Sequence, residues 1–177
     1  QIVVSRSFGQ RISNLKELRP IVSNFAVRAA EKLRNEKQKC SQVSVFVRTS
    51  PFNRNKPQHS DLKTIELFTP TNDTRDILIA AKRGLLPIFR SGYDYAKAGI
   101  ILNKFSDEKT KQYSLFKDPN EPKQNMRLMK YLDQMNNYET QIYYASQNTK
   151  KWSPMKQNMT SPKSVSYTHL RAHETKK

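Results

Sequence analysis

The residue types that most often perform chemistry are scattered along this chain. Asp73 and Asp76 could form a carboxylate pair, but Asp73 ends a run of N-capping residues and Asp76 falls in the following first turn, where acidic side chains stabilise a helix start. His169 and His173 have the four-residue spacing of helical metal ligands, yet they lie in a final stretch, 164–177, that breaks with the preceding sequence. We therefore predict no catalytic residue and no metal site.

The other chemical candidates have equally ordinary interpretations. His59 is isolated in a polar loop, and only four glycines occur, without a glycine-rich phosphate loop. Cys40 is the single cysteine, which excludes an internal disulfide and suits a reducing compartment. It follows a helical pattern, so we interpret it as an ordinary residue at a polar helix end.

A short apolar pair has a different kind of potential. Leu115 and Phe116 end the pentapeptide QYSLF, which begins at Gln112 and lies in the polar, turn-rich segment SDEKTKQYSLFKDPNEPKQ. Few neighbouring residues could bury this pair, so we expect it to need a binding partner.

Composition limits the function classes. The 177 residues carry a formal net charge of +17, which favours binding to phosphate polymers or anionic surfaces. No apolar run is long enough for a membrane span, and no signal-peptide pattern occurs. The chain begins at Gln1 inside an apolar run, which suggests a piece of a longer protein. Residues 164–177 resemble translated sequencing-adapter sequence, so we exclude them from fold reasoning.

Periodicity predicts two helices and four strands before residue 106. Apolar residues at three- and four-residue steps predict one helix from Asn14 to about Lys39, with a capping box formed by Asn14 and Glu17. A second predicted helix follows the cap cluster at 71–73 and ends near Pro87. Alternating or β-branched runs predict strands at 2–8, 43–48, 63–68 and 95–103.

This order, β-α-β-β-α-β, predicts an α+β domain: a four-stranded sheet with both helices on one face. The other sheet face would be open, carrying Arg48, Lys97 and Asn103. Arg6 is ambiguous because it shares its side of the strand with Val4 and Phe8.

The predicted organisation has four parts: a domain at 1–105, a linker at 106–123, a small C-terminal module at 124–163 and a non-native tail at 164–177. Methionines and leucines predict a short helix from Met126 to about Asn136, and IYYA at 142–145 is strand-like.

Several blocks in this order resemble the UmuC group of Y-family (translesion) DNA polymerases. RSFG, AAEKLR, VFVRTSPF, PTNDTRDI and YAKAGIILNKF are similar to the little-finger domain of that group. QYSLF, LMKYLDQMN, IYYASQ and the W-x-x-MK run resemble its C-terminal module. The resemblance implies a fragment of the catalytic subunit of bacterial DNA polymerase V. The catalytic carboxylates and Mg²⁺ would belong to upstream domains, so this fragment should be inactive alone and need no cofactor.

The resemblance also implies a role for the open face. In this family the little finger grips primer-template phosphates without reading sequence, during SOS bypass of damaged DNA. By similarity the DNA-binding residues are Ser5, Arg6, Ser7, Arg48, Thr49, Ser50, Lys97 and Asn103. Hydroxyls and cations of this kind make phosphate contacts.

Partners follow from the same resemblance. Bacterial clamp-binding motifs resemble Q-L-x-L-F, which implies that Gln112, Tyr113, Leu115 and Phe116 bind the sliding clamp, with Tyr113 where leucine is usual. UmuD and the RecA filament are implied partners without assignable residues, and the expected location is the bacterial cytoplasm, at the nucleoid. The C-terminal module departs from the family pattern after Asn137, so we expect it to be poorly ordered.

One alternative stays open. The same element order occurs in stand-alone RNA-binding modules, which stack bases on aromatic residues of two central strands. Phe8 and Phe46 are the candidates for that role. Preference for single-stranded RNA over primer-template DNA would favour this reading.

Overall fold

The computed structural model describes residues 1–53, 55–107, 121–137 and 142–147. Its elements, in chain order, are β1 (Ile2–Ile12), α1 (Leu15–Asn35), β2 (Gln38–Thr49), β3 (Ser60–Thr71), α2 (Thr74–Ile88), β4 (Tyr95–Asp107) and α3 (Glu121–Asn137). The predicted α+β class and the β-α-β-β-α-β order are confirmed. No helix in these described ranges has the length and apolar character needed to cross a membrane.

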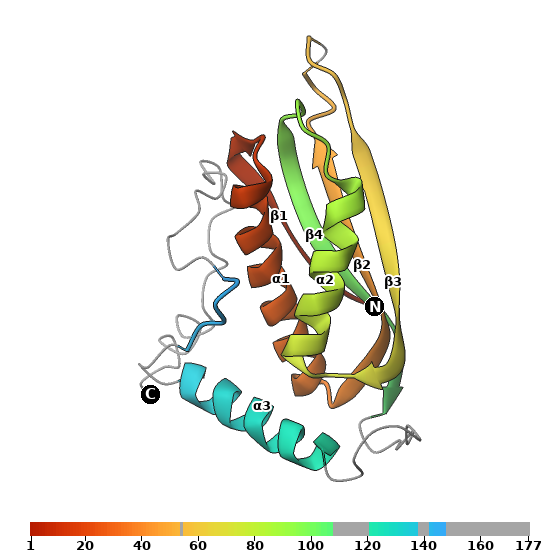
Figure 1. The fold of residues 1–177 in the computed structure, drawn as a ribbon, viewed down its shortest axis with the longest axis vertical. Coiled ribbons are helices and arrows are strands. Elements are labelled where there is room, and N and C mark those ends of the chain that lie inside the picture. The colour runs from red at the N-terminus through yellow and green to blue at the C-terminus, as the bar shows by residue number, and fades with distance from the viewer. Residues whose placement is uncertain (54, 108–120, 138–141, 148–177) are drawn as a thin grey trace, which may run out of the picture.

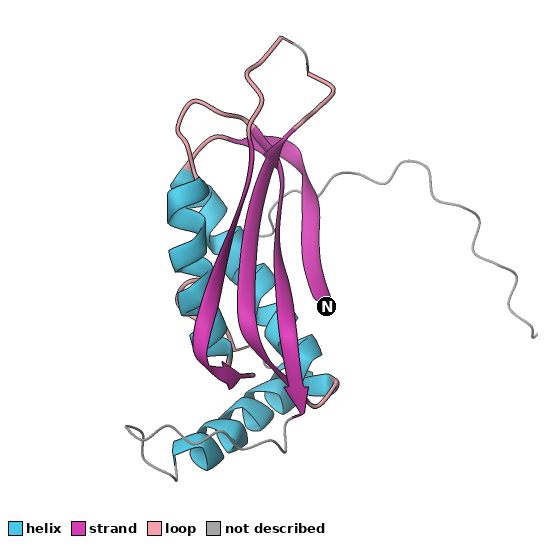
Figure 2. Ribbon diagram, turned by 90° about the vertical axis from the view of Figure 1, so that its right-hand side faces the viewer, coloured by secondary structure: helices cyan, strands magenta, loops and turns pink. Residues whose placement is uncertain are grey.

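The four strands form one sheet in the order β1-β4-β2-β3, and each neighbouring pair is antiparallel. The central strands are therefore β4 and β2. Helices α1 and α2 cover one face of the sheet, and no described element covers the other, which is called the open face below (Figures 1 and 2).

The core lies between the helices and the sheet. The stripe of α1 (Leu18, Phe25 and Leu33) and that of α2 (Ile77 and Leu85) are buried. They pack against alternate residues of the central strands: Val43, Val45, Val47, Ala98, Ile100 and Leu102. The period-3.6 and period-2 patterns of the sequence thus meet in one apolar layer.

Both predicted helix starts are confirmed, with one difference in detail. The Asn14 side chain accepts a hydrogen bond from the Lys16 amide at 2.8 Å, rather than from the Glu17 amide. Asp73 caps α2 by accepting from the Arg75 amide at 2.8 Å. These contacts satisfy amide groups that a helix start leaves without a partner.

Three strands are longer than predicted: β2 begins at Gln38, β3 spans Ser60–Thr71 and β4 continues to Asp107. Two further predicted boundaries were also wrong. β1 continues through Gly9 to Ile12, because this edge strand bulges: the five-residue step from Ser7 to Ile12 lies opposite a two-residue step on β4, from Lys97 to Tyr95. α1 ends at Asn35, since Lys37 takes a left-handed φ of 53° that reverses the chain into β2.

Cys40 consequently lies in β2 and not at a helix end. It is fully buried, and this burial raises the pKa of its thiol to about 12. A thiol in this setting is an inert part of the core.

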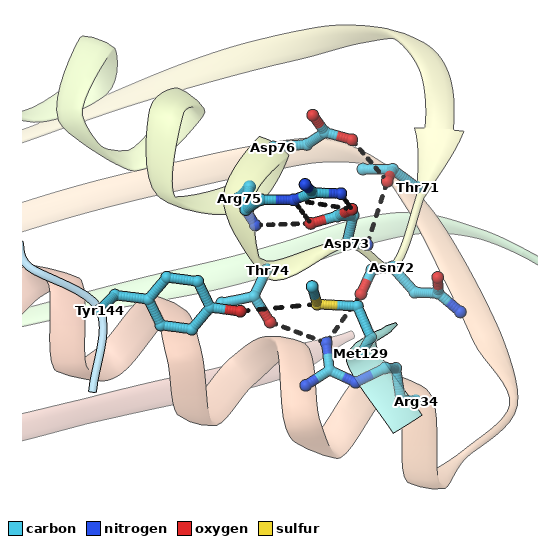
Figure 3. A network of polar contacts seen from close by, with 9 residues as sticks. All are labelled: Arg34, Thr71, Asn72, Asp73, Thr74, Arg75, Asp76, Met129 and Tyr144. Carbon is cyan, nitrogen blue, oxygen red and sulfur yellow. Dashed lines mark hydrogen bonds and ion pairs between the residues drawn. The ribbon is translucent and has the colours of Figure 1, made fainter. Parts of the chain in front are cut away.

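Helix α3 packs across the ends of α1 and α2 (Figure 1). Arg34 of α1 binds both carboxylate oxygens of Asp133, at 2.5 and 2.6 Å, and its remaining nitrogen donates to the Asn72 carbonyl and the Thr74 hydroxyl. Met129 is buried beside this guanidinium (Figure 3).

The expectation of poor order was therefore wrong for α3 and the segment 142–147. This segment is not a strand: the Gln147 amide donates to the Tyr144 carbonyl, which closes a turn. The Tyr144 ring packs at the core margin, and its hydroxyl donates to the Met129 sulfur (Figure 3). The predicted strand did not form because the packed Tyr144 ring and hydrogen bonds to the Asn24 and Asn136 side chains, rather than a sheet edge, hold this segment.

Candidate nucleic-acid interface

One transverse row of polar residues crosses the open face of the sheet. The register places Ser7 of β1 opposite Lys97 of β4, and Lys97 opposite Arg48 of β2. Ser60 of β3 lies opposite Arg48 and completes the row. Directly paired residues of antiparallel strands project to the same face, and four strands span about 14 Å. The row therefore presents two cations between two hydroxyl groups.

The cations of this row are available to a ligand. Arg48 is exposed and Lys97 is half-buried, and neither forms an ion pair within the described ranges. Two like charges stand directly opposite each other here, which is unfavourable for a sheet in isolation. A bound anion would relieve that repulsion.

The middle of the open face is apolar. Phe46 of β2 covers Gly99 of β4: a β-carbon built on Gly99 would lie 2.6 Å from two Phe46 ring carbons. Val3 and Leu62 are about half exposed beside this pair, and Ile101 lies in the same register. The polar row thus borders an apolar saddle made of Val3, Phe46, Leu62, Gly99 and Ile101.

The RNA-binding alternative gains no support from this face. Phe8 is only 2% exposed and belongs to the core, so it cannot stack on a base. Phe46 remains as one aromatic candidate on the central strands, where two or three stacking rings would be expected.

The far end of the open face is nearly charge-neutral. Glu66 of β3 accepts hydrogen bonds from Gln42 at 2.8 Å and from Lys104 at 2.9 Å. The hydrogen bond from Lys104 is the main cause that lowers the pKa of Glu66. Asn103 lies opposite Gln42 at this end, about 20 Å along β4 from Lys97 at the usual rise per residue. Among the described strand residues of the open face, Arg48 and Lys97 are therefore the adjacent cations without an ion pair.

The structure brings five of the eight predicted DNA-binding residues to the open face: Ser5, Ser7, Arg48, Lys97 and Asn103. Arg6 differs, because its register partner is Ala98, whose side chain lies in the core. It therefore points to the helix side of the edge strand, where it is solvent-exposed. The register thus resolves the ambiguity that the sequence left for Arg6 and places its side chain away from the open face.

Thr49 and Ser50 lie at the end of β2. Thr49 is only 7% exposed, and its hydroxyl accepts a hydrogen bond from the His59 amide at 2.9 Å. Its amide donates to the His59 carbonyl, so Thr49 holds the β2–β3 connection rather than offering a hydroxyl to a ligand. Ser50 is half-buried and lines a small cavity.

Sequence reasoning missed two contributors at this end of the sheet. Ser60 starts β3 three residues earlier than predicted, so its place in the row could not be seen. Arg11 follows Gly9, which was taken as the end of the first strand. The polar–apolar pair Arg11–Ile12 was the feature of the sequence from which a longer first strand could have been predicted.

The four predicted clamp-binding residues, Gln112, Tyr113, Leu115 and Phe116, lie outside the described residues, as does the tail at 164–177. Within the described ranges, no group of three or more His, Cys, Asp or Glu side chains is arranged to hold a metal ion.

Residues 1–115 match the family described as "impB/mucB/samB family C-terminal domain". The chain belongs to this family. The impB/mucB/samB match spans β1 to β4, the whole of the sheet with both of its helices, and reaches Leu115.

Curated members of the impB/mucB/samB family extend the likeness beyond that domain. The chain is 42% identical over 166 residues to Protein UmuC of Salmonella typhimurium, which covers 92% of this chain and 39% of that protein. It is also 42% identical over 163 residues to Protein MucB of Escherichia coli, covering 92% of this chain and 38% of the relative. The predicted resemblance to the UmuC group is confirmed.

A solved structure titled "Complex of beta-clamp processivity factor and little finger domain of PolIV" is also similar, with 13% identity and a TM-score of 0.45. It covers 66% of this chain and 98% of that one. The chain spans about two fifths of the length of the curated relatives it matches.

Proposed function

We propose that residues 1–107 grip the phosphate backbone of primer-template DNA through the open face of the sheet. The observation that carries this proposal is the row Ser7–Lys97–Arg48–Ser60, in which two hydroxyls share one face with two cations that form no ion pair among the described residues. Guanidinium, ammonium and hydroxyl groups are the usual donors to phosphate oxygens.

This kind of contact suits a polymerase that must move along any template. Phosphate contacts hold the duplex in position without reading bases, so affinity does not depend on sequence. The apolar saddle beside the row offers no pair of hydrogen-bonding groups of the kind that identifies a base. The open face is therefore better suited to holding the phosphate backbone than to recognising particular bases.

The parent protein would supply the chemistry. On the resemblance to UmuC, domains upstream of this chain would carry the catalytic carboxylates and Mg²⁺, and would bypass lesions in damaged DNA during the SOS response. UmuD, the RecA filament and the bacterial nucleoid belong to the same proposal. This chain would contribute attachment to DNA and to the sliding clamp.

Binding of the full chain to a fluorescent primer-template across a salt series tests the grip. We expect log K to fall linearly with log salt, and the double substitution Arg48→Gln with Lys97→Gln to reduce the slope by about 1.8, at about 0.9 per phosphate contact. Lys82→Gln, on the exposed side of α2, is the matched charge control. A salt-independent affinity, or the same slope in the double variant, contradicts the proposal.

Clamp attachment rests on the pentapeptide at 112–116 and needs a separate test. A short anchor inserts a few apolar side chains into a pocket, and these carry most of the binding energy. Leu115→Ala with Phe116→Ala should abolish binding to a purified bacterial sliding clamp, whereas Lys111→Ala should not. Attachment to the clamp would hold the chain near the DNA after it dissociates, so that it rebinds at the same place.

A further inference from the structure

A small cavity of about 40 Å³ lies where three connections meet at one end of the sheet. Its wall includes Arg11 from the end of β1, three residues around the β2–β3 connection (Ser50, Asn53 and Lys56) and Asp94 from the α2–β4 connection. The loops that meet at this end are drawn at the top of Figure 2. Four of these five side chains can donate hydrogen bonds, and two of them are cations.

The bulge in β1 explains why a cation from the edge strand reaches this place. Between Ser7 and Ile12 the strand gains three residues relative to β4, and Ile12 then returns to the core opposite Tyr95. Arg11 is the exposed neighbour of this buried anchor. Bulges at sheet edges commonly re-aim a side chain in this way.

Lys56 is held in the cavity wall by an ion pair. Its ammonium lies 2.5 Å from Asp94, which links the β2–β3 connection to the α2–β4 connection. Arg11 forms no ion pair among the described residues, so one positive charge of the wall has no counter-ion there. The cavity is therefore positive overall despite the carboxylate.

The cavity also continues the polar row. Ser50, the first residue after β2, follows Arg48 by two residues, which corresponds to roughly 7 Å in an extended chain. One water-sized sphere needs about 10–15 Å³, so the cavity has room for three or four such spheres, comparable to the oxygens of one phosphate group.

We propose that this cavity binds a single backbone phosphate of the nucleic acid, next to those held by the Arg48–Lys97 row. Arg11 donates to the phosphate, with Ser50 and Asn53 completing the contact. Lys56 supplies charge, and Asp94 limits the affinity so that the strand can leave. This proposal rests on the proposed function of the open face and adds a second contact to it.

Two substitutions with opposite expected signs test the cavity in the full chain. Arg11→Gln should weaken primer-template binding several-fold and reduce the salt slope by about 0.9, the value for one lost phosphate contact. Asp94→Asn removes the carboxylate that repels the phosphate, so it should tighten binding. Glu31→Gln on α1 and Lys82→Gln on α2 remove the same charges away from the sheet. The change in DNA affinity caused by Arg11→Gln must be larger than that caused by Lys82→Gln. Likewise, the change caused by Asp94→Asn must be larger than that caused by Glu31→Gln.

The outcomes separate the two proposals. If Asp94→Asn weakens binding, or Arg11→Gln equals Lys82→Gln, the cavity holds no phosphate and Asp94 serves only to pin Lys56. If the affinity of the unmodified chain for primer-template does not depend on salt, the proposed function of the whole open face is wrong. The same holds if the Arg48 and Lys97 substitutions leave that affinity unchanged. Thermal unfolding of each variant shows whether the fold is retained.

Discussion

Arg48 of β2 and Lys97 of β4 stand directly opposite each other on the two central strands of the sheet. Like charges in this position lower the stability of a sheet by several tenths of a kcal/mol, up to about 1 kcal/mol. Their presence on the open face is explained if the face meets a polyanion, because phosphates between the cations turn repulsion into attraction.

The first prediction separates stability from binding at this pair. Lys97→Gln should raise the free energy of unfolding by about 0.5 kcal/mol, because it removes the repulsion with Arg48. The same change should weaken DNA binding. Urea denaturation and primer-template titration measure the two effects.

Salt supplies the control for that prediction. At 1 M salt the Debye length is about 3 Å, so the gain in stability should largely vanish. A variant that loses both stability and binding at low salt would show that Lys97 is a structural residue.

The second prediction concerns Gly99, which lies under the Phe46 ring. A β-carbon at this position would meet the Ser5 β-carbon at 2.4 Å as well as the ring at 2.6 Å. Gly99→Ala should therefore cost about 1–3 kcal/mol of unfolding free energy, as overpacking does. Chemical denaturation measures the loss.

A double-mutant cycle checks the cause of that loss. Phe46→Leu removes the ring that covers Gly99, so it should recover part of the cost of Gly99→Ala, leaving the contact with Ser5. Strictly additive effects would show that the ring does not contact this position.

The third prediction concerns the attachment of α3. The Arg34 side chain is 12% exposed and binds both oxygens of Asp133, whose side chain is 22% exposed. Asp133→Asn leaves a largely buried guanidinium without its charged partner, so docking of α3 should weaken by about 1–3 kcal/mol. Faster amide hydrogen exchange within α3, at unchanged protection of β2 and β4, is the expected result.

The exposed ion pair between Lys104 and Glu66 is the matched control, because both side chains are 59% exposed. Lys104→Gln should change stability little, because an ion pair exposed to water contributes little net free energy. If Asp133→Asn has an effect no larger than this, then Met129 and Tyr144, rather than the ion pair, hold the helix.

The fourth prediction uses the buried thiol of Cys40, whose pKa rises from 9.0 to about 12 in the folded chain. Above pH 9 the unfolded chain loses this proton while the folded chain keeps it. Stability should therefore fall with rising pH between 9 and 12, by about 1.4 kcal/mol per pH unit from this group. Comparison with the Cys40→Ala variant separates the contribution of the Cys40 thiol to the pH dependence of stability from the contributions of lysine and tyrosine titrations.

Thiol labelling provides a second measurement of the same burial. A maleimide at pH 8 should react with the unfolded chain and leave the folded chain unmodified, because the thiolate is the reactive form. Rapid labelling under native conditions would show that Cys40 is not in the core.

Local pattern alone determined most of the fold. The apolar stripes of α1 and α2, the caps at Asn14 and Asp73, and the alternation through Val43, Val45 and Val47 each follow from repeats of 3.6 or 2 residues. Arg48, Lys97 and Asn103 could be assigned to the open face for the same reason, and the sequence blocks identified the family.

Only the tertiary structure decided the rest, because strand register, a bulge and a docking contact each join residues distant in the chain. Register turned Arg6 away from the face that holds Ser5 and Ser7. The bulge brought Arg11 to the cavity beside Ser50. The ion pair between Arg34 and Asp133 spans 99 residues, so no local repeat could reveal it. These pairings depend on which side chains meet across strands and helices, and sequence periodicity carries no such information.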